Sequence, residues 1–188
     1  MRLIIVRHGE TRENALKIVY GHLPGELTDK GIEQAKKTGQ LLSNEHIDAV
    51  LSSDLKRCVD TSRIISSYIN ACPIQFTVSL REQQQDSLNG KKVDDVDWDN
   101  LPPDVENDDQ MLARGKKILS ETYQRYPDKT VLFVTHKRFE NILINILLKR
   151  KASDRTELEN VLNSSVSIFE VNEDLEGDPA MKHSVDHI

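Results

Sequence analysis

Several features are scarce in this sequence, and each scarcity excludes a class of protein. The 188 residues include only two cysteines, Cys58 and Cys72. Two cysteines cannot form a disulfide framework, which favours a reducing, cytoplasmic location. The N-terminal apolar run, Leu3–Val6, is too short for a signal peptide or a membrane span. We therefore expect a cytoplasmic protein with no membrane partner.

Positive charge is also in short supply. Lysine and arginine total 25 against 31 aspartates and glutamates, a formal net charge of −6 at pH 7. A non-specific nucleic-acid binder needs a basic excess, so we expect no nucleic-acid partner. Charged residues of both signs are interspersed with clear apolar periodicity, which is typical of a globular chain. The length predicts a single domain over residues 1–188.

Several common phosphate and metal motifs are missing as well. The sequence contains neither G-x-x-x-x-G-K-[ST] nor G-x-G-x-x-G, so nothing in it indicates a nucleotide-binding loop. A cysteine-dependent phosphatase loop has five residues between its cysteine and its arginine, whereas four separate Cys58 from Arg63. The histidines form no cluster with metal-ligand spacing, and we expect no metal site.

Short apolar runs alternate with helical patterns along the chain. The runs are typical of strands buried on both faces of a parallel sheet: Leu3–Val6, Ala49–Leu51, Ile74–Val78, Val131–Val134 and Val166–Val171. Helical patterns follow the cap Thr28, extend from Leu55 to Ile69, follow a capping box formed by Asn107 and Gln110, and include Phe139 to Leu147. This alternation predicts an α/β fold with a doubly wound, mostly parallel sheet.

Two stretches do not fit the alternation. Residues 83–110 are polar and acidic, and we interpret them as a long excursion between a strand and a helix rather than as an interdomain linker. Eight carboxylates lie between residues 94 and 109: Asp94, Asp95, Asp97, Asp99, Asp104, Glu106, Asp108 and Asp109. The polar tail after Val171 is predicted to be loop.

Four residues that can carry chemistry fall near the carboxyl ends of the predicted strands. His8 follows the first apolar run after Arg7, and His136 follows the run Val131–Val134 after one residue. Arg57 lies early in the helix after the second run, and Glu82 lies just past the third. In an open α/β sheet, ligands bind at the carboxyl ends of the strands. We therefore expect both histidines to face one crevice.

The charges expected at that edge suit a phosphoryl group. Two guanidiniums and two imidazoles match a tetrahedral dianion, because arginine presents a planar fork to phosphate oxygens. One neutral imidazole can attack phosphorus and form a phosphohistidine, and the surrounding cations should lower its pKa and favour that neutral form. A carboxyl group at the rim can protonate the leaving oxygen and later deprotonate water. These residue types together indicate phosphoryl transfer.

Longer motifs around these residues resemble one family. Arg7-His8-Gly9-Glu10-Thr11-Arg12-Glu13-Asn14 is similar to the R-H-G-E-[ST]-x-x-N signature of the histidine phosphatase superfamily, which includes the phosphoglycerate mutases. Ser52-Ser53-Asp54-Leu55-Lys56-Arg57 resembles its S-S-D-L-x-R segment, and Leu80-Arg81-Glu82 with Gly90 resembles its acid motif. Val131–His136 and Asn163-Ser164-Ser165-Val166 resemble the strand of the second histidine and a late N-x-S-V segment. The resemblance spans nearly the whole chain.

The resemblance implies a three-layer α/β/α fold and a phosphohistidine mechanism that needs no metal or other cofactor. Carried over by position, His8 is the nucleophile and Glu82 the proton donor. The groups implied to hold the phosphoryl oxygens are Arg7, Arg57 and His136, assisted by Asn14 and the backbone at Gly21. The implied partner is a small phosphorylated metabolite. The sequence predicts no oligomeric state.

Three departures from the family pattern bear on function. Lys137 follows His136 where the family usually has glycine; it either supplies positive charge to the substrate or points away as a surface residue. Asp86-Ser87-Leu88-Asn89 replaces the usual G-E-W-E and alters the wall that faces the substrate. The excursion at 83–110 is shorter than the large insertions of glycolytic mutases, which favours hydrolysis over phosphoryl shuttling.

These observations predict a phosphomonoesterase, and two alternatives stay open. In a cofactor-dependent phosphoglycerate mutase, a second hydroxyl rather than water would take the phosphoryl group from His8. A non-catalytic phospholigand binder is suggested only by Lys137 and the altered loop. The presence of both arginines, both histidines and the glutamate argues against it.

Overall fold

The computed structural model describes residues 1–70, 72–156 and 158–188, which form a six-stranded sheet with helices on both faces. The strands are β1 (Arg2–Arg7), β2 (Ala49–Ser53), β3 (Ile74–Thr77), β4 (Thr130–Thr135), β5 (Val166–Val171) and β6 (Gly177–Ser184). Their order is β3-β2-β4-β1-β5-β6. The first four are mutually parallel, and β5 and β6 pair antiparallel. The predicted mostly parallel α/β fold is confirmed.

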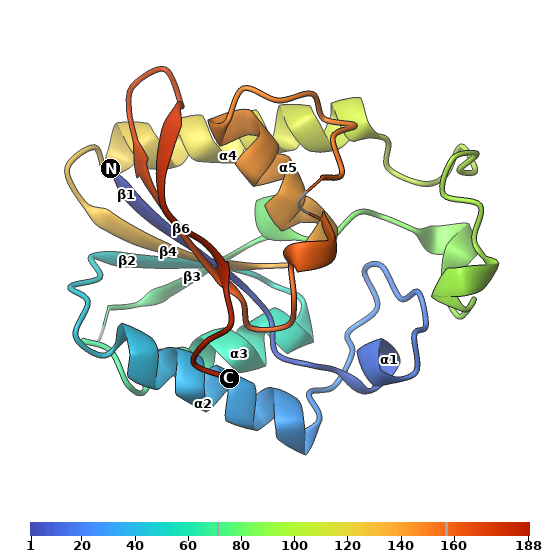
Figure 1. Ribbon diagram of the computed structural model, residues 1–188, viewed down its shortest axis with the longest axis horizontal. Helices are drawn as coiled ribbons and strands as arrows, with labels where there is room; N and C mark the ends of the chain where they lie inside the picture. The colour runs from blue at the N-terminus through green and yellow to red at the C-terminus, as the bar shows by residue number, and fades with distance from the viewer. Residues whose placement is uncertain (71, 157) are drawn as a thin grey trace.

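Two helices cover each face of the sheet, which gives three layers (Figure 1). One face carries α2 (Asp29–Leu42) and α3 (Lys56–Ser66), and the other carries α4 (Asp108–Arg125) and α5 (Lys137–Leu147). Alternate residues of β1 divide the core, because Ile4 and Val6 pack toward α2 and α3 while Leu3 and Ile5 pack toward α4 and α5. Burial on both faces explains why these strands are continuous apolar runs in the sequence.

The predicted helix caps are present. Thr28 accepts a hydrogen bond from the Gly31 amide at the start of α2. Asn107 and Gln110 form a reciprocal capping box at the start of α4, with both hydrogen bonds 2.9 Å long. Each cap satisfies backbone N–H groups that have no partner inside the helix.

The predicted loop after Val171 is wrong, because this part of the chain forms the strand β6. It pairs with β5 from Val171 opposite Gly177 to Val166 opposite Ser184, with irregular register between. Most β6 side chains are at least partly exposed on the edge of the sheet, and Gly177 and His183 are the buried exceptions. An edge strand needs no apolar alternation, so the sequence gives no strand signal here.

One short helix also lacks a counterpart among the predicted elements. α1 (Arg12–Ala15) is held by a capping box between Thr11 and Asn14. It lies at the same end of the molecule as the segment 83–110, beyond the carboxyl ends of the parallel strands (Figure 1). No helix in the described ranges is long and apolar enough to cross a membrane.

The acidic excursion has a small core of its own. It contains the 3-10 turns η2 (Asp86–Leu88) and η3 (Val93–Asp95). Leu88 and Val105 from the excursion pack with Val19, which precedes α2 in the chain. The excursion therefore rests on the loop that follows α1 and forms part of the same end of the molecule.

Candidate active site

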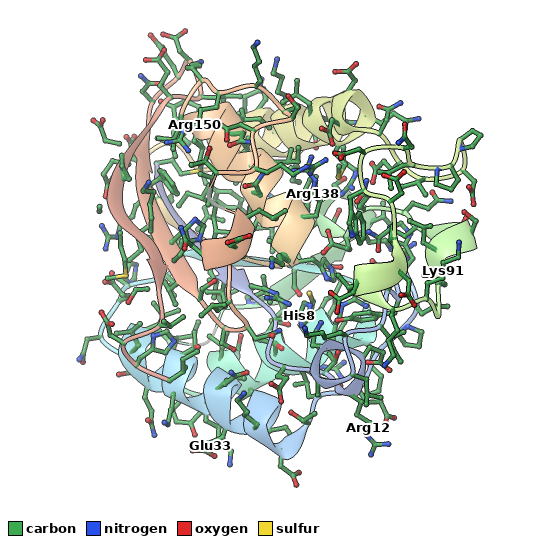
Figure 2. All side chains as sticks on the ribbon, turned by 45° about the vertical axis from the view of Figure 1, so that its right-hand side comes forward. His8, Arg12, Glu33, Lys91, Arg138 and Arg150 are labelled. Carbon is green, nitrogen blue, oxygen red and sulfur yellow. The ribbon has the colours of Figure 1, made fainter. Side chains whose placement is uncertain are left out.

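The two histidines meet because β1 and β4 are adjacent and parallel. Arg7 lies opposite Thr135 in the strand register, so each histidine is the next residue beyond a paired position. Their ring centroids are 5.2 Å apart, with the planes at 62°. His8 is 2% exposed and His136 is fully buried. Figure 2 shows His8 in the middle of the molecule, whereas Arg12, Glu33 and Lys91 lie at its periphery.

A backbone carbonyl determines which nitrogen of His8 is protonated. His8 Nδ1 lies 2.7 Å from the Gly9 carbonyl oxygen. A carbonyl can only accept, so Nδ1 carries the hydrogen and Nε2 keeps its lone pair. Burial lowers the pKa of His8 well below its ordinary value, and the charges of Arg57 and Arg7 lower it further. His8 is therefore a neutral imidazole with a free Nε2, the form that can act as a nucleophile.

His136 is the opposite tautomer. Its Nδ1 accepts a hydrogen bond from Arg57 Nε at 3.0 Å, so the hydrogen resides on Nε2, which donates to Ser53 Oγ at 2.9 Å. Burial and the Arg57 charge lower the pKa of His136 well below the ordinary value. Two histidines with the same chemistry are thus held in different states by their hydrogen-bond partners. His136 has both nitrogens engaged, and His8 has one available.

Arg57 joins His136 to the loop that follows α1. Its Nη2 donates to the Gly21 carbonyl at 2.8 Å and its Nη1 to the Leu23 carbonyl at 2.6 Å. The guanidinium also lies over the Tyr20 ring, 4.4 Å from the centroid. Gly21 has φ = +36°, a conformation that suits glycine, and an added Cβ would meet Gln85 at 3.1 Å. This arginine therefore fixes the loop as well as the second histidine.

Glu82 lies at the amino end of α5. Its Oε1 accepts from the amides of Gln83 and Phe139, at 2.9 and 3.2 Å, and its Oε2 accepts from the Arg138 amide at 3.3 Å. A helix N-terminus supplies free N–H groups and favours negative charge. The first turn after His136 thus brings the carboxylate beside the second histidine, as the sequence predicts for a shared crevice.

Two arginines hold the loop that carries Glu82. Arg114 of α4 donates to the Arg81 carbonyl at 2.7 Å and pairs with Glu106 at 2.7 Å, and its guanidinium stacks 3.9 Å from the Phe139 ring centroid. Arg81 makes two bonds of 2.6 Å to Asp54, within the segment that also contains Ser53. The acid loop is therefore fixed from α4 and from the start of α3.

Arg7 and Lys137 bring further positive charge to the site. Arg7 is 7% exposed and donates to the Val161 carbonyl at 2.8 Å. Lys137 is the first residue of α5 and is half-buried. Burial lowers the pKa of Lys137, and the nearby Arg7 charge lowers it further. No hydrogen bond or ion pair links the Lys137 ammonium to the described residues.

Asn14 contacts the site through a second asparagine. Asn163 Nδ2 donates to Asn14 Oδ1 at 3.0 Å and to the His8 carbonyl at 3.1 Å. Asn14 is also the partner of the N-cap Thr11 in the capping box of α1, so its oxygen accepts from the Thr11 amide as well. Asn163 therefore links Asn14 to His8 through two hydrogen bonds.

Cys58 has the position expected for a small core residue. It is fully buried in the layer of α2 and α3, and burial raises the pKa of its thiol. Its sulfur lies 3.4 Å from His136 Nε2. Among the described residues no group of three histidine, cysteine, aspartate or glutamate side chains could hold a metal ion.

Sequence reasoning missed several residues that support the site. Ser53, Asn163 and Arg81 lie inside the motifs quoted for the family resemblance, so the signal was present without an assigned role. Tyr20 and Arg114 lie outside those motifs, and only the structure brings them to the site.

The fold and this site define a class of protein. Residues 3–177 match the family model of the histidine phosphatase superfamily (branch 1). The chain belongs to this superfamily.

Two curated relatives and one solved structure are similar over most of the chain. Phosphoglycerate mutase-like protein 4 of Arabidopsis thaliana is 30% identical over 186 residues, covering 89% of this chain and 78% of the relative. Adenosylcobalamin/alpha-ribazole phosphatase of Escherichia coli K12 is 29% identical over 163 residues, covering 79% of each. The crystal structure of the alpha-ribazole phosphatase from Shigella flexneri aligns with a TM-score of 0.84 and 26% identity, covering 98% of this chain and 96% of that one.

Proposed function

We propose that this protein is a phosphomonoesterase that hydrolyses a small phosphorylated metabolite through a phosphohistidine at His8. The observation that carries the proposal is the fixed tautomer of His8, which leaves Nε2 free beside Arg7 and Arg57. Its support from known proteins is the superfamily and the phosphatases among the relatives.

The proposed reaction has two steps. His8 Nε2 attacks phosphorus, the bond from phosphorus to the ester oxygen breaks, and Glu82 gives that oxygen a proton. Water then attacks the phosphohistidine, Glu82 takes a proton from it, and inorganic phosphate leaves with His8 restored. Arg7 and Arg57 balance the charge of the transferring group, with His136 and Asn14 beside it.

Lys137 has a separate part in this proposal. A half-buried ammonium that forms no ion pair with the described residues, and that lies near Arg7, suits an anionic group of the substrate. In this proposal Asp86 to Asn89 and the loop at Gly21, which lie against each other, form a wall that faces the substrate. The charge balance is met by side chains alone, and on this ground we propose a reaction that needs no metal.

Phosphoenzyme trapped by denaturation at alkaline pH tests the mechanism, because phosphohistidine is hydrolysed in acid. Wild-type protein given a radiolabelled phosphomonoester should carry acid-labile phosphate, and His8→Ala should carry none and lose turnover. Cys58→Ser is the control, because this buried cysteine is not assigned a step. Near-native turnover in His8→Ala would refute the covalent route. Loss of wild-type activity in EDTA, restored by a divalent ion, would refute metal independence.

Mutase activity is the alternative, favoured by the similarity to a phosphoglycerate mutase-like protein. Protein given 3-phosphoglycerate and a trace of 2,3-bisphosphoglycerate should release inorganic phosphate. Formation of 2-phosphoglycerate without phosphate release would assign the mutase reaction instead. Tight binding of phosphate esters with neither product would indicate a phospholigand binder.

A further inference from the structure

The first turn of α5 carries a buried glutamate that the proposed reaction does not use. Glu140 is fully buried. Its Oε1 accepts a hydrogen bond from Ser167 Oγ at 3.1 Å and lies 3.6 Å from His183 Nδ1. Its Oε2 is buried and accepts no hydrogen bond from the described residues. A buried carboxylate oxygen without a donor is costly, so it calls for a compensating charge.

Arg7 has the complementary property. Its Nη1 donates to the Val161 carbonyl, but its Nε is buried and donates to none of the residues that the structure describes. Guanidinium and carboxylate are the pair of side chains best matched in charge and geometry. Each of these two groups therefore has an unpaired polar atom, and no ion pair or hydrogen bond joins the two side chains in the described part of the chain, so they interact at longer range than a direct contact.

The sheet brings the two groups into one layer. Leu3 and Ile5 pack in the core under α5, and the two-residue period of a strand puts Arg7 on the same face. Ser167, which binds Glu140, lies opposite Ile5 in the pairing of β1 with β5. Glu140 therefore lies over the paired residues Ile5 and Ser167, and Ile5 is two residues from Arg7 along β1.

The two charges also act on each other. Burial lowers the pKa of Arg7, and Tyr20, Glu82 and Glu140 oppose that lowering, in that order. Burial raises the pKa of Glu140, and His183, Ser167 and the Arg7 charge oppose that rise. Each group therefore reduces the cost of burying the other.

We propose that Glu140 is a positioning residue that compensates the charge of the buried Arg7 guanidinium, and that Ser167 and His183 hold Glu140 in turn. The proposal rests on the proposed function in one respect, the binding of a phosphoryl group by Arg7. In this proposal the strand β6 also supports the site, because it carries His183, which contacts Glu140.

A double-mutant cycle of Arg7→Gln and Glu140→Gln tests this proposal. The readouts are the thermal unfolding midpoint, the Kd of inorganic phosphate by calorimetry, and KM and kcat with an aryl phosphate. Glu170→Gln is the matched control, because Glu170 lies on β5 and pairs at 2.9 Å with Arg2 at the other end of β1, in an exposed position.

We expect Glu140→Gln to raise the phosphate Kd and the KM about tenfold while kcat changes by less than about threefold. In the Arg7→Gln background the same substitution should cost less than about twofold. The midpoint of the double variant should lie at or above that of Arg7→Gln, since Glu140 is then no longer a charge buried alone. Glu170→Gln should leave Kd and KM unchanged.

Additive losses in both phosphate binding and unfolding midpoint would overturn the proposal and leave Glu140 a structural residue. If Glu140→Gln is poorly folded, Ser167→Ala keeps the charge of Glu140 and removes its hydrogen bond from Ser167 Oγ, together with the bond that this oxygen accepts from the His183 amide. It should raise KM about threefold, and an unchanged KM would also overturn the proposal. If wild-type protein hydrolyses no phosphate ester, the proposed function fails, while the midpoints of the cycle still decide the role of Glu140.

Discussion

The carboxyl end of the sheet and the acidic segment 83–110 are adjacent regions whose charged side chains differ in exposure to solvent. At the sheet, Arg7, Arg57, His8 and His136 are each at most 7% exposed. All four form hydrogen bonds with backbone carbonyls or with each other. In the segment, the Asp94 side chain is 75% exposed, and its ion pair with Lys17 spans 3.7 Å. Burial strengthens electrostatic interactions and exposure to salt weakens them. The buried charges at the sheet can therefore determine which of the neighbouring side chains are protonated. The exposed charges of the segment have a weaker electrostatic effect on their surroundings.

Arg114 forms one of the ion pairs that join the two regions. Arg114 pairs with Glu106 of the segment and also donates to the carbonyl of Arg81, next to Glu82. Its side chain is 19% exposed and that of Glu106 is 15% exposed, between the extremes of the two regions. Substitutions ordered from the sheet outward should therefore have progressively smaller effects.

The largest effect is expected at Glu82. Glu82→Gln should lower kcat for alkyl phosphates by ~10²–10⁴-fold, because an alkoxide needs a proton as it leaves. An activated aryl phosphate, whose leaving group needs little protonation, should lose far less. The measurement is kcat for a matched alkyl and aryl ester.

Unfolding midpoints and phosphate binding serve as controls for Glu82→Gln, because the amide replaces a carboxylate that accepts from three backbone N–H groups. Equal losses on both esters in a folded variant that binds phosphate would assign the proton transfer to another group.

An intermediate effect is expected at the junction. Arg114→Gln removes the ion pair with Glu106 and the bonds to the acid loop, and should cost about 2 kcal/mol of unfolding free energy and about tenfold in kcat/KM. Lys117→Gln on the same helix is the matched control, since Lys117 and Glu121 form an exposed pair at 3.9 Å. That control should change stability by at most about 0.5 kcal/mol. Equal effects of the two substitutions would show that the segment and the site are not coupled through Arg114.

The sequence predicts the buried region far better than the exposed one. His8 and His136 follow strands that are continuous apolar runs, so their approach at one edge follows from the parallel sheet. The largest cause of the lowered pKa of His8 is burial, which the sequence does not predict. The sequence indicates only the smaller effect of the surrounding cations. The opposite tautomers of the histidines depend on the Gly9 carbonyl and on Arg57, contacts that no motif encodes.

The misses have a physical cause as well. β6 has almost no buried side chains and hence no apolar pattern, yet it carries His183 to Glu140. Arg114 reaches the acid loop through tertiary contacts, with no local signal in α4. The carboxylates of the segment form a uniform acidic run in the sequence, but Glu106 and Asp108 are paired with Arg114 and Arg138 in the structure.

The smallest effect is expected from the exposed carboxylates of the segment 83–110. A negative rim raises the energy of approach of multiply charged anions, so kcat/KM should favour a monophosphate over its bisphosphate analogue. The preference should narrow as salt rises, because the Debye length falls from ~30 Å at 0.01 M to ~8 Å at 0.15 M. Since several of the carboxylates are paired within the protein, we expect the ratio of the two kcat/KM values to change by no more than about threefold.

The double variant Asp95→Asn, Asp99→Asn should remove most of that change with salt. The control Asp128→Asn, an exposed substitution just before the amino end of β4, should not. A ratio that is independent of salt, or that favours the bisphosphate at low salt, would mean that the segment takes no part in selecting the substrate.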